Sequence, residues 1–111
     1  MEYKPPGAIA SLDPATFALK AAKVATLLGT MANPRRLAVL CRLVERGEMT
    51  VGDLADDADL SQSALSQHLA RLRDEGLVTF RRDRQTLWYR IADPRTEALL
   101  ATLYQLYCHE D

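Results

Sequence analysis

The sequence predicts a mainly α-helical domain with one small β-hairpin, and three observations favour that class. Asp or Asn precedes proline three times, at Asp13-Pro14, Asn33-Pro34 and Asp93-Pro94. Asp and Asn are good N-caps, and proline suits the first helical position because its missing N–H would have no partner there. Two short helical patterns follow each other between residues 50 and 76, and two strand-like runs come next. We therefore expect four helices, two strands and a last helix.

Length and composition fit a single globular domain. The chain has 111 residues, of which 48% are hydrophobic and 26% charged, which is ordinary for such a domain. Residues 1–12 show little periodicity, so we expect a flexible arm at 1–12 and one domain at 13–111. The sequence shows neither an apolar run long enough to span a membrane nor a signal-peptide pattern. Two cysteines are too few for a disulfide scaffold, so we expect a cytoplasmic protein with reduced thiols.

Two helices are expected in the first half of the chain. The first covers about 14–29, carries one apolar stripe and should end at Gly29. The second covers about 34–46 and should end at Gly47, which suits a C-cap. Cys41 lies on the apolar stripe of the second helix, so we expect it on the buried face.

A helix-turn-helix pattern follows these two helices. Thr50 can cap a short third helix that reaches about Ala58, and Ser61 can cap a fourth helix that stops at Gly76. Two short helices joined by a tight turn are typical of this motif. The leucines expected to face the core from the fourth helix are Leu65, Leu69 and Leu72.

The remaining elements are a hairpin and a last helix. Residues 77–82 and 86–91 are rich in β-branched and aromatic side chains, which favours a β-hairpin. The turn between them contains no glycine, which leaves its geometry open. Residues 94–108 carry an apolar pattern that predicts a helix.

Positive charge is concentrated on the fourth helix and the hairpin, although the whole chain has a net charge of −1. Residues 61–90 have a local balance of +3 and the remainder −4, a distribution typical of nucleic-acid binding. Polar side chains on the fourth helix could reach base edges in a major groove, and the hairpin tip could contact the backbone or minor groove. The candidate DNA-binding residues are Gln62, Ser63, Ser66, Gln67, His68, Arg81, Arg82, Arg84 and Gln85.

Other interpretations of these polar residues stay open. A solvated helix face and a solvated turn would have the same composition. The acidic cluster at 53–59 lacks the spacing of a calcium loop, so we expect a solvated face there. No glycine-rich phosphate loop or nucleophile elbow occurs in the sequence. We therefore expect no enzyme, no cofactor and no metal.

These motifs together resemble the ArsR/SmtB family of winged-helix repressors, from about Leu27 to Cys108. The matching segments are LLGTMANPRRLAVLCRL, TVGDLADDADLSQSALSQHLARLRDEGLV and RRDRQTLWYRI. The resemblance implies a winged helix-turn-helix (ααααββα) that dimerises through its first and last helices. It also implies binding to a palindromic operator and release when an effector binds. Candidate residues for the homodimer surface, which periodicity alone does not separate from the core, are Phe17, Val24, Leu28, Leu99, Leu103 and Leu106.

The metal-binding patterns of that family are missing from this chain. The third helix reads TVGDLAD and lacks the arsenic-type Cys-x-Cys, and Asp93 is not followed by the histidines of the zinc-type set. A site built from Cys41, Cys108 and His109 would have three ligands without a fourth.

The two cysteines resemble those of the persulfide-responsive, BigR/SqrR-like branch, which has one in the second helix and one near the end of the last. Cys41 and Cys108 match these positions. By resemblance, small persulfides would join the two thiols of one subunit through a di-, tri- or tetrasulfide, and the operator-binding form would be lost. Such chemistry needs one thiolate to attack sulfane sulfur and a second thiol to resolve the product.

Three alternatives remain at this stage. The thiols could be small hydrophobes, a common role for cysteine. The same fold could sense a metal ion or general oxidants. It could also be a winged-helix protein-interaction module that binds no DNA.

Overall fold

The computed structural model describes residues 13–108, so the arm expected at 1–12 lies outside the described residues. The elements are α1 (Pro14–Met31), α2 (Pro34–Arg46), β1 (Met49–Thr50), α3 (Val51–Ala58), α4 (Gln62–Asp74), β2 (Val78–Asp83), β3 (Thr86–Ile91), α5 (Pro94–Leu103) and η2 (Tyr104–Cys108), a π-helical turn. The predicted class, helices with a small β-hairpin in a winged helix-turn-helix, is confirmed.

The predicted helix caps form through side-chain oxygens. The Asp13, Asn33 and Asp93 side chains each accept hydrogen bonds of 2.8–3.0 Å from backbone N–H groups in the first turns of α1, α2 and α5. Thr50 and Ser61 accept equivalent bonds of 3.1 Å at the starts of α3 and α4. These bonds satisfy N–H groups that have no partner within the helix.

Two helix ends differ from the predicted ones. Gly29 does not end α1, which continues to Met31, and the N–H of Ala32 then donates to the Gly29 carbonyl at 3.2 Å. Glycine lowers helix stability but does not force an end when its backbone stays helical. The last helix was expected to run to about residue 108 as an α-helix, but it changes to π-helical hydrogen bonding at Tyr104.

The sheet has three antiparallel strands in the order β1-β3-β2, and β1 was not predicted. Met49 in β1 and Phe80 in β2 both lie opposite Tyr89 in β3. The strand β2 also begins and ends one residue later than expected. The short β1 therefore joins the helix-turn-helix to the hairpin through a shared central strand.

The hairpin turn has a geometry that the sequence left open. Asp83 pairs with Thr86, which leaves Arg84 and Gln85 as a two-residue loop. Arg84 takes a φ of 60°, a left-handed conformation that residues with a Cβ adopt at some cost. The loop therefore holds a cation at the tip without glycine.

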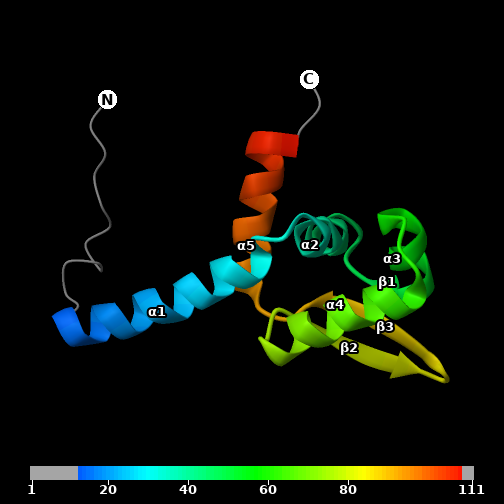
Figure 1. Cartoon of the computed structure of the whole chain (residues 1–111), viewed down its shortest axis with the longest axis horizontal. Coiled ribbons are helices and arrows are strands. Elements are labelled where there is room, and N and C mark those ends of the chain that lie inside the picture. Colours follow the sequence, from blue (N-terminus) through cyan, green and yellow to red (C-terminus); the bar gives the residue numbers. More distant parts are fainter. Residues whose placement is uncertain (1–12, 109–111) are drawn as a thin grey trace.

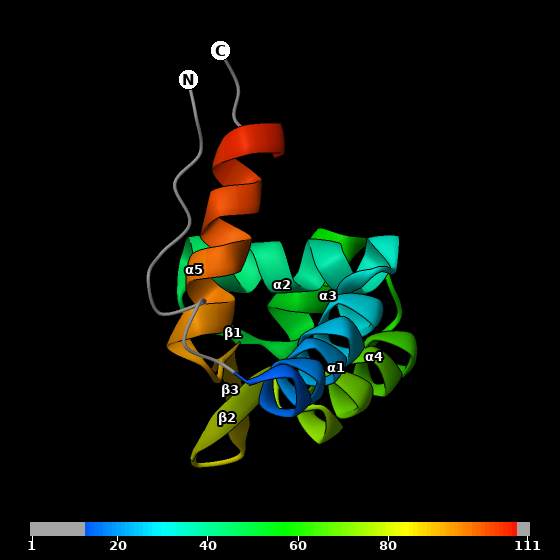
Figure 2. The same ribbon diagram turned by 90° about the vertical axis from the view of Figure 1, so that its left-hand side faces the viewer.

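The core lies between α2, α3, α4 and the sheet. Its fully buried members include the predicted Leu65, Leu69 and Leu72 of α4. Leu100 of α5 also belongs to this core, whereas α1 extends away from the body to one side and the C-terminal part of α5 rises from it (Figure 1). In the view turned by 90°, α1 points toward the reader in front of the body (Figure 2). No helix within residues 13–108 is long and apolar enough to cross a membrane.

Candidate DNA-binding surface and thiol pocket

The candidate DNA-reading residues of α4 lie where the sequence predicts. Ser61 caps the helix, and Gln62, Ser63, Ser66 and Gln67 are all exposed. Figure 1 shows α4 beside the β2–β3 hairpin, so the two candidate elements belong to one side of the body. His68, which was grouped with these residues, is half-buried and therefore less accessible than the other four.

The arginines of the wing, the β2–β3 hairpin, fall into two groups. Arg82 and Arg84 are exposed, and neither forms an ion pair within the described residues 13–108. Arg81 instead makes a bidentate pair with Glu48, with Nε–Oε2 at 2.9 Å and Nη2–Oε1 at 3.0 Å. Its guanidinium also lies 5.5 Å from the centre of the Trp88 ring. Arg81 was predicted as a tip residue, but it lies in the middle of β2 opposite Trp88, where its guanidinium is paired with Glu48.

Glu48 is a residue that the sequence analysis missed. The hydrogen bonds from Arg81 lower the pKa of its carboxyl group, and the charge of Arg81 acts in the same direction. Only the pairing of strands distant in sequence brings this carboxylate to the wing, so no local pattern identifies it.

The C-terminal end of α4 is tied to α1 by a second contact that the sequence analysis missed. The hydroxyl of Thr30, only 2% exposed, donates to the carboxylate of Glu75. Arg36 Nε donates to the Thr30 carbonyl at 2.7 Å. This contact joins the expected dimer helix to the end of the expected recognition helix.

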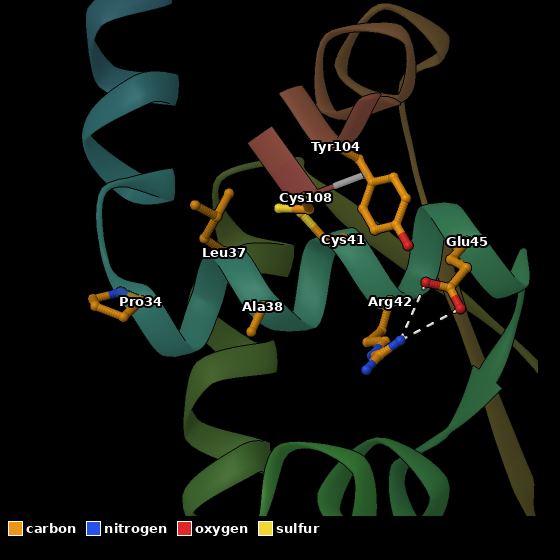
Figure 3. Close-up of a pocket in the computed structure, with 8 residues that line it drawn as sticks. All are labelled: Pro34, Leu37, Ala38, Cys41, Arg42, Glu45, Tyr104 and Cys108. Carbon is orange, nitrogen blue, oxygen red and sulfur yellow. Dashed lines mark hydrogen bonds and ion pairs between the residues drawn. The ribbon is translucent and has the colours of Figure 1, made fainter. Parts of the chain in front are cut away.

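The two cysteines meet in one surface pocket although 67 positions separate them in the sequence. Both are free thiols: Cys41 in α2 is half-buried and packs against the core, on the face expected to be buried, and Cys108 in η2 is exposed. The pocket is open to solvent and has a volume of about 790 Å³. Figure 3 shows its lining, which consists of Pro34, Leu37, Ala38, Cys41, Arg42, Glu45, Tyr104 and Cys108.

The environment of the pocket affects the two thiols differently. Burial raises the pKa of the Cys41 thiol, and the negative charge of Cys108 raises it further, while Arg42 opposes both effects. Because the thiolate is the reactive form, the reactivity of Cys41 at neutral pH is restrained. Both thiols line the same pocket, so the charge of one affects the other.

A group of charged residues lines the other side of the pocket. Arg42 Nε lies 2.7 Å from Asp57 Oδ2 in α3, and Arg42 Nη1 lies 3.2 Å from Glu45 Oε2. The Tyr104 hydroxyl points toward Glu45 (Figure 3). The charge of Glu45 raises the pKa of Tyr104, with burial second. Asp57 is exposed, as expected for the acidic face, and it also forms this ion pair, which the sequence analysis did not predict.

A metal site is not formed by the part of the chain that the structure describes. Among residues 13–108, no three His, Cys, Asp or Glu side chains gather where they could hold an ion. His109, the third member of the set considered above, lies outside the described residues. That three-ligand site therefore stays untested.

Comparison with known proteins agrees with this fold. Residues 33–79 match the family described as "Bacterial regulatory protein, arsR family". The transcriptional activator HlyU of Vibrio cholerae is 48% identical over 87 residues, which cover 78% of this chain and 80% of that protein. The biofilm growth-associated repressor of Agrobacterium fabrum is 40% identical over 89 residues, which cover 80% and 75%.

Solved structures show the same likeness. Reduced HlyU from V. cholerae has a TM-score of 0.80 and 45% identity, over 85% of this chain and 98% of that one. The transcriptional repressor BigR from Xylella fastidiosa has a TM-score of 0.77 and 36% identity, over 86% and 94%. The protein is thus a DNA-binding transcriptional regulator of the winged helix-turn-helix class, and it is not an enzyme. It belongs to the ArsR family.

Proposed function

We propose that this chain is a homodimeric repressor that senses reactive sulfur species through Cys41 and Cys108. In the reduced state it binds a palindromic operator, and it releases the operator when a di- to tetrasulfide joins the two thiols of one subunit. The observation that carries this proposal is the shared pocket, which holds both thiols on two elements far apart in sequence. One relative is named a repressor, and the structure of another, HlyU, is described as its reduced form, which agrees with a redox-dependent regulator. Because its operator would lie on a chromosome, the cytoplasm remains the expected location.

The DNA-binding half of the proposal rests on one surface. Exposed polar side chains begin at the N-terminus of α4, where backbone N–H groups favour phosphate. Exposed Arg82, Arg84 and Gln85 extend the same surface at the tip of the wing. In a homodimer, two such helices would enter half-sites one helical turn apart.

The sensing half starts at the exposed thiol. The Cys108 thiolate attacks the terminal sulfur of a persulfide RSSH, so that Cys108–SSH forms and RS⁻ leaves. The Cys41 thiolate then attacks the inner sulfur of Cys108–SSH and displaces HS⁻, which leaves a disulfide. The two thiols are oxidised together, and the persulfide is reduced to RSH and H₂S. Each sulfur atom inserted into a longer bridge requires one further RSSH and releases one further RSH.

A polysulfide suits this pocket for a geometric reason. A direct disulfide demands a narrow range of distances between the two side chains, whereas inserted sulfur atoms relax that demand. The pocket is open and of the size that binds small ligands, so a small persulfide has access to Cys108. Cys41 lies deeper, as suits the resolving thiol.

Operator release would follow as a shift between two states. A bridge links α2 to η2 and so favours arrangements in which these two elements are held together. If those arrangements place the two recognition helices out of step with the half-sites, operator affinity falls. A tenfold loss needs only about 1.4 kcal/mol of difference between the states.

Intact mass spectrometry tests the sensing chemistry. Reduced protein exposed to a glutathione persulfide donor should lose the hydrogen atoms of both thiols. Its mass should also rise by one sulfur atom for a trisulfide and by two for a tetrasulfide, and a direct disulfide adds no sulfur. Neither Cys41→Ser nor Cys108→Ser should form the bridged product. Persulfide exposure that leaves both thiols free would overturn the proposal. Bridging by peroxide alone would favour general oxidants, and a co-purified metal would favour a metal sensor.

A further inference from the structure

We propose that Tyr104, Glu45, Arg42 and Asp57 form a polar chain that transmits the state of the thiols to the helix-turn-helix. We call these four residues the polar chain. The inference rests on the proposed function, and it assigns residues that act through their neighbours and do not themselves react with sulfur. They are positioning residues for operator release.

The first observation is the continuity of the polar chain from η2 to α3. Tyr104 begins η2, and its hydroxyl points toward Glu45 on α2 (Figure 3). Glu45 pairs with Arg42 Nη1 at 3.2 Å, and Arg42 Nε pairs with Asp57 at 2.7 Å. One guanidinium therefore holds carboxylates from two elements, and a change at Glu45 alters how Arg42 is shared with Asp57.

The second observation is where the polar chain lies relative to the sulfur atoms. Arg42 follows Cys41 directly, and Tyr104 precedes Cys108 by four residues in the same π-helical turn. Arg42, Glu45 and Tyr104 all line the pocket that holds the thiols. A bridge between the sulfur atoms must hold η2 against α2, and this changes the position of Tyr104 relative to Glu45.

The far end of the polar chain reaches the DNA-binding unit. Asp57 lies in the last turn of α3, the first helix of the helix-turn-helix. This helix packs on α4, whose exposed side chains form the candidate reading surface. Among the described residues, the Arg42–Asp57 pair is the ion pair that joins α2 to α3. The Arg42–Asp57 ion pair therefore offers a direct polar contact between the thiol pocket and the helix-turn-helix.

The test measures the release factor, defined as the operator dissociation constant of bridged protein divided by that of reduced protein. Asp57→Asn removes the charge at one end of the polar chain, and Tyr104→Phe removes only the hydroxyl at the other. Intact mass verifies the bridge in every sample. Each variant should lower the release factor by about two- to fivefold, the range expected for an exposed pair. The double variant should lower it no further than the larger single effect, because both act on one route.

Matched controls come from neighbouring residues. Asp56→Asn makes the same charge change on α3 at an exposed side chain without an ion pair among the described residues. Tyr107→Phe removes a hydroxyl from an exposed tyrosine in the same π-helical turn. Both controls should keep the wild-type release factor. A general effect of charge on DNA binding cancels because the release factor compares two states of one variant.

The outcomes separate this inference from the proposed function. If bridged wild-type protein releases the operator while Asp57→Asn and Tyr104→Phe do so equally well, the polar chain is overturned and sulfur sensing stands. Effects that multiply in the double variant also overturn a single route. If the wild-type protein forms no bridge, or keeps its operator when bridged, both proposals fail together.

Discussion

At the scale of single residues, the two cysteines differ in ways that assign them separate roles. Cys108 is exposed on the final π-helical turn, whereas Cys41 is half-buried in α2. Burial, followed by the charge of Cys108, raises the pKa of Cys41. We therefore expect Cys108 to take the first sulfur and Cys41 to close the bridge.

This difference predicts a pH dependence of the closing step. Because the Cys41 pKa is raised, its thiolate is a minor species at neutral pH, and its fraction grows until the pH reaches that pKa. Below this point, a rise of about one pH unit should speed bridge closure about tenfold. Timed acid quenching and intact mass of the persulfidated protein would measure the rate. A closing rate that does not change with pH would contradict the assigned roles.

Sequence reasoning at this scale found the capping residues and missed the ion pair between Arg81 and Glu48. The caps at Asp13, Asn33 and Asp93 follow from neighbouring positions, and the structure confirms them. Glu48 becomes important only because strand pairing brings it to Arg81, more than thirty positions away. A single sequence carries no local signal for such a partner.

At the scale of secondary-structure elements, the wing arginines should differ in their effect on DNA binding. Arg84→Ala removes an exposed cation and keeps a residue with a Cβ at the same left-handed φ. We expect weaker operator binding, a salt dependence reduced by about one ion, and little change in stability. Fluorescence anisotropy at several salt concentrations measures both quantities.

Arg81→Ala provides the comparison within the same wing. Arg81 already forms an ion pair with Glu48. Its substitution should therefore remove this contact within the protein and have less effect on ionic contacts with DNA. We expect a smaller change in salt dependence than for Arg84→Ala. Equal salt dependence in the two variants would show that Arg81 contacts phosphate directly.

The contact between α1 and α4 gives a prediction about stability. Thr30→Val keeps the shape of a buried side chain but removes the hydrogen bond to Glu75. Its loss should lower the free energy of unfolding by about 1 kcal/mol. Urea denaturation measures this change, and Thr102→Val, which removes an exposed hydroxyl on α5, is the matched control. The same loss in both variants would show that the Glu75 contact adds nothing.

The starts of the helices could be predicted from the sequence, but the strand β1 and the π-helical turn could not. Strong local signals, such as a capping residue before proline, place the starts of helices well. The strand β1 is only two residues long and depends on pairing with β3. It is too short to show the alternation of apolar and polar residues that predicts a strand. The π-helical turn depends on a shift in hydrogen bonding at Tyr104, which residue preference does not encode.

At the scale of the whole molecule, the exposed apolar side chains favour the proposed homodimer. Phe17, Val24 and Leu28 on α1 are each about half exposed, and Leu106 in η2 is exposed too. Leu99 and Leu103 are partly buried against the core, so they have a structural role already. The sequence did not single out Leu19 or Tyr107, which are also exposed.

A charge placed in this stripe should break the dimer. Val24→Glu would bury a carboxylate in an apolar contact between two copies, which costs several kcal/mol without a partner charge. We expect a monomer in size-exclusion chromatography with light scattering, and weak operator binding. Ala22→Glu puts the same charge away from the stripe on α1 and should stay dimeric. A Val24→Glu protein that remains a dimer would place the interface elsewhere.

The most direct test of the central claim follows operator affinity through a cycle of sulfur exposure. Anisotropy of labelled operator DNA would be measured with reduced protein, after glutathione persulfide, and after reduction with a thiol. The account predicts tight binding, release and full recovery for the wild-type protein, and no release for Cys41→Ser or Cys108→Ser. Release in either serine variant, or unchanged binding of bridged wild-type protein, would contradict it.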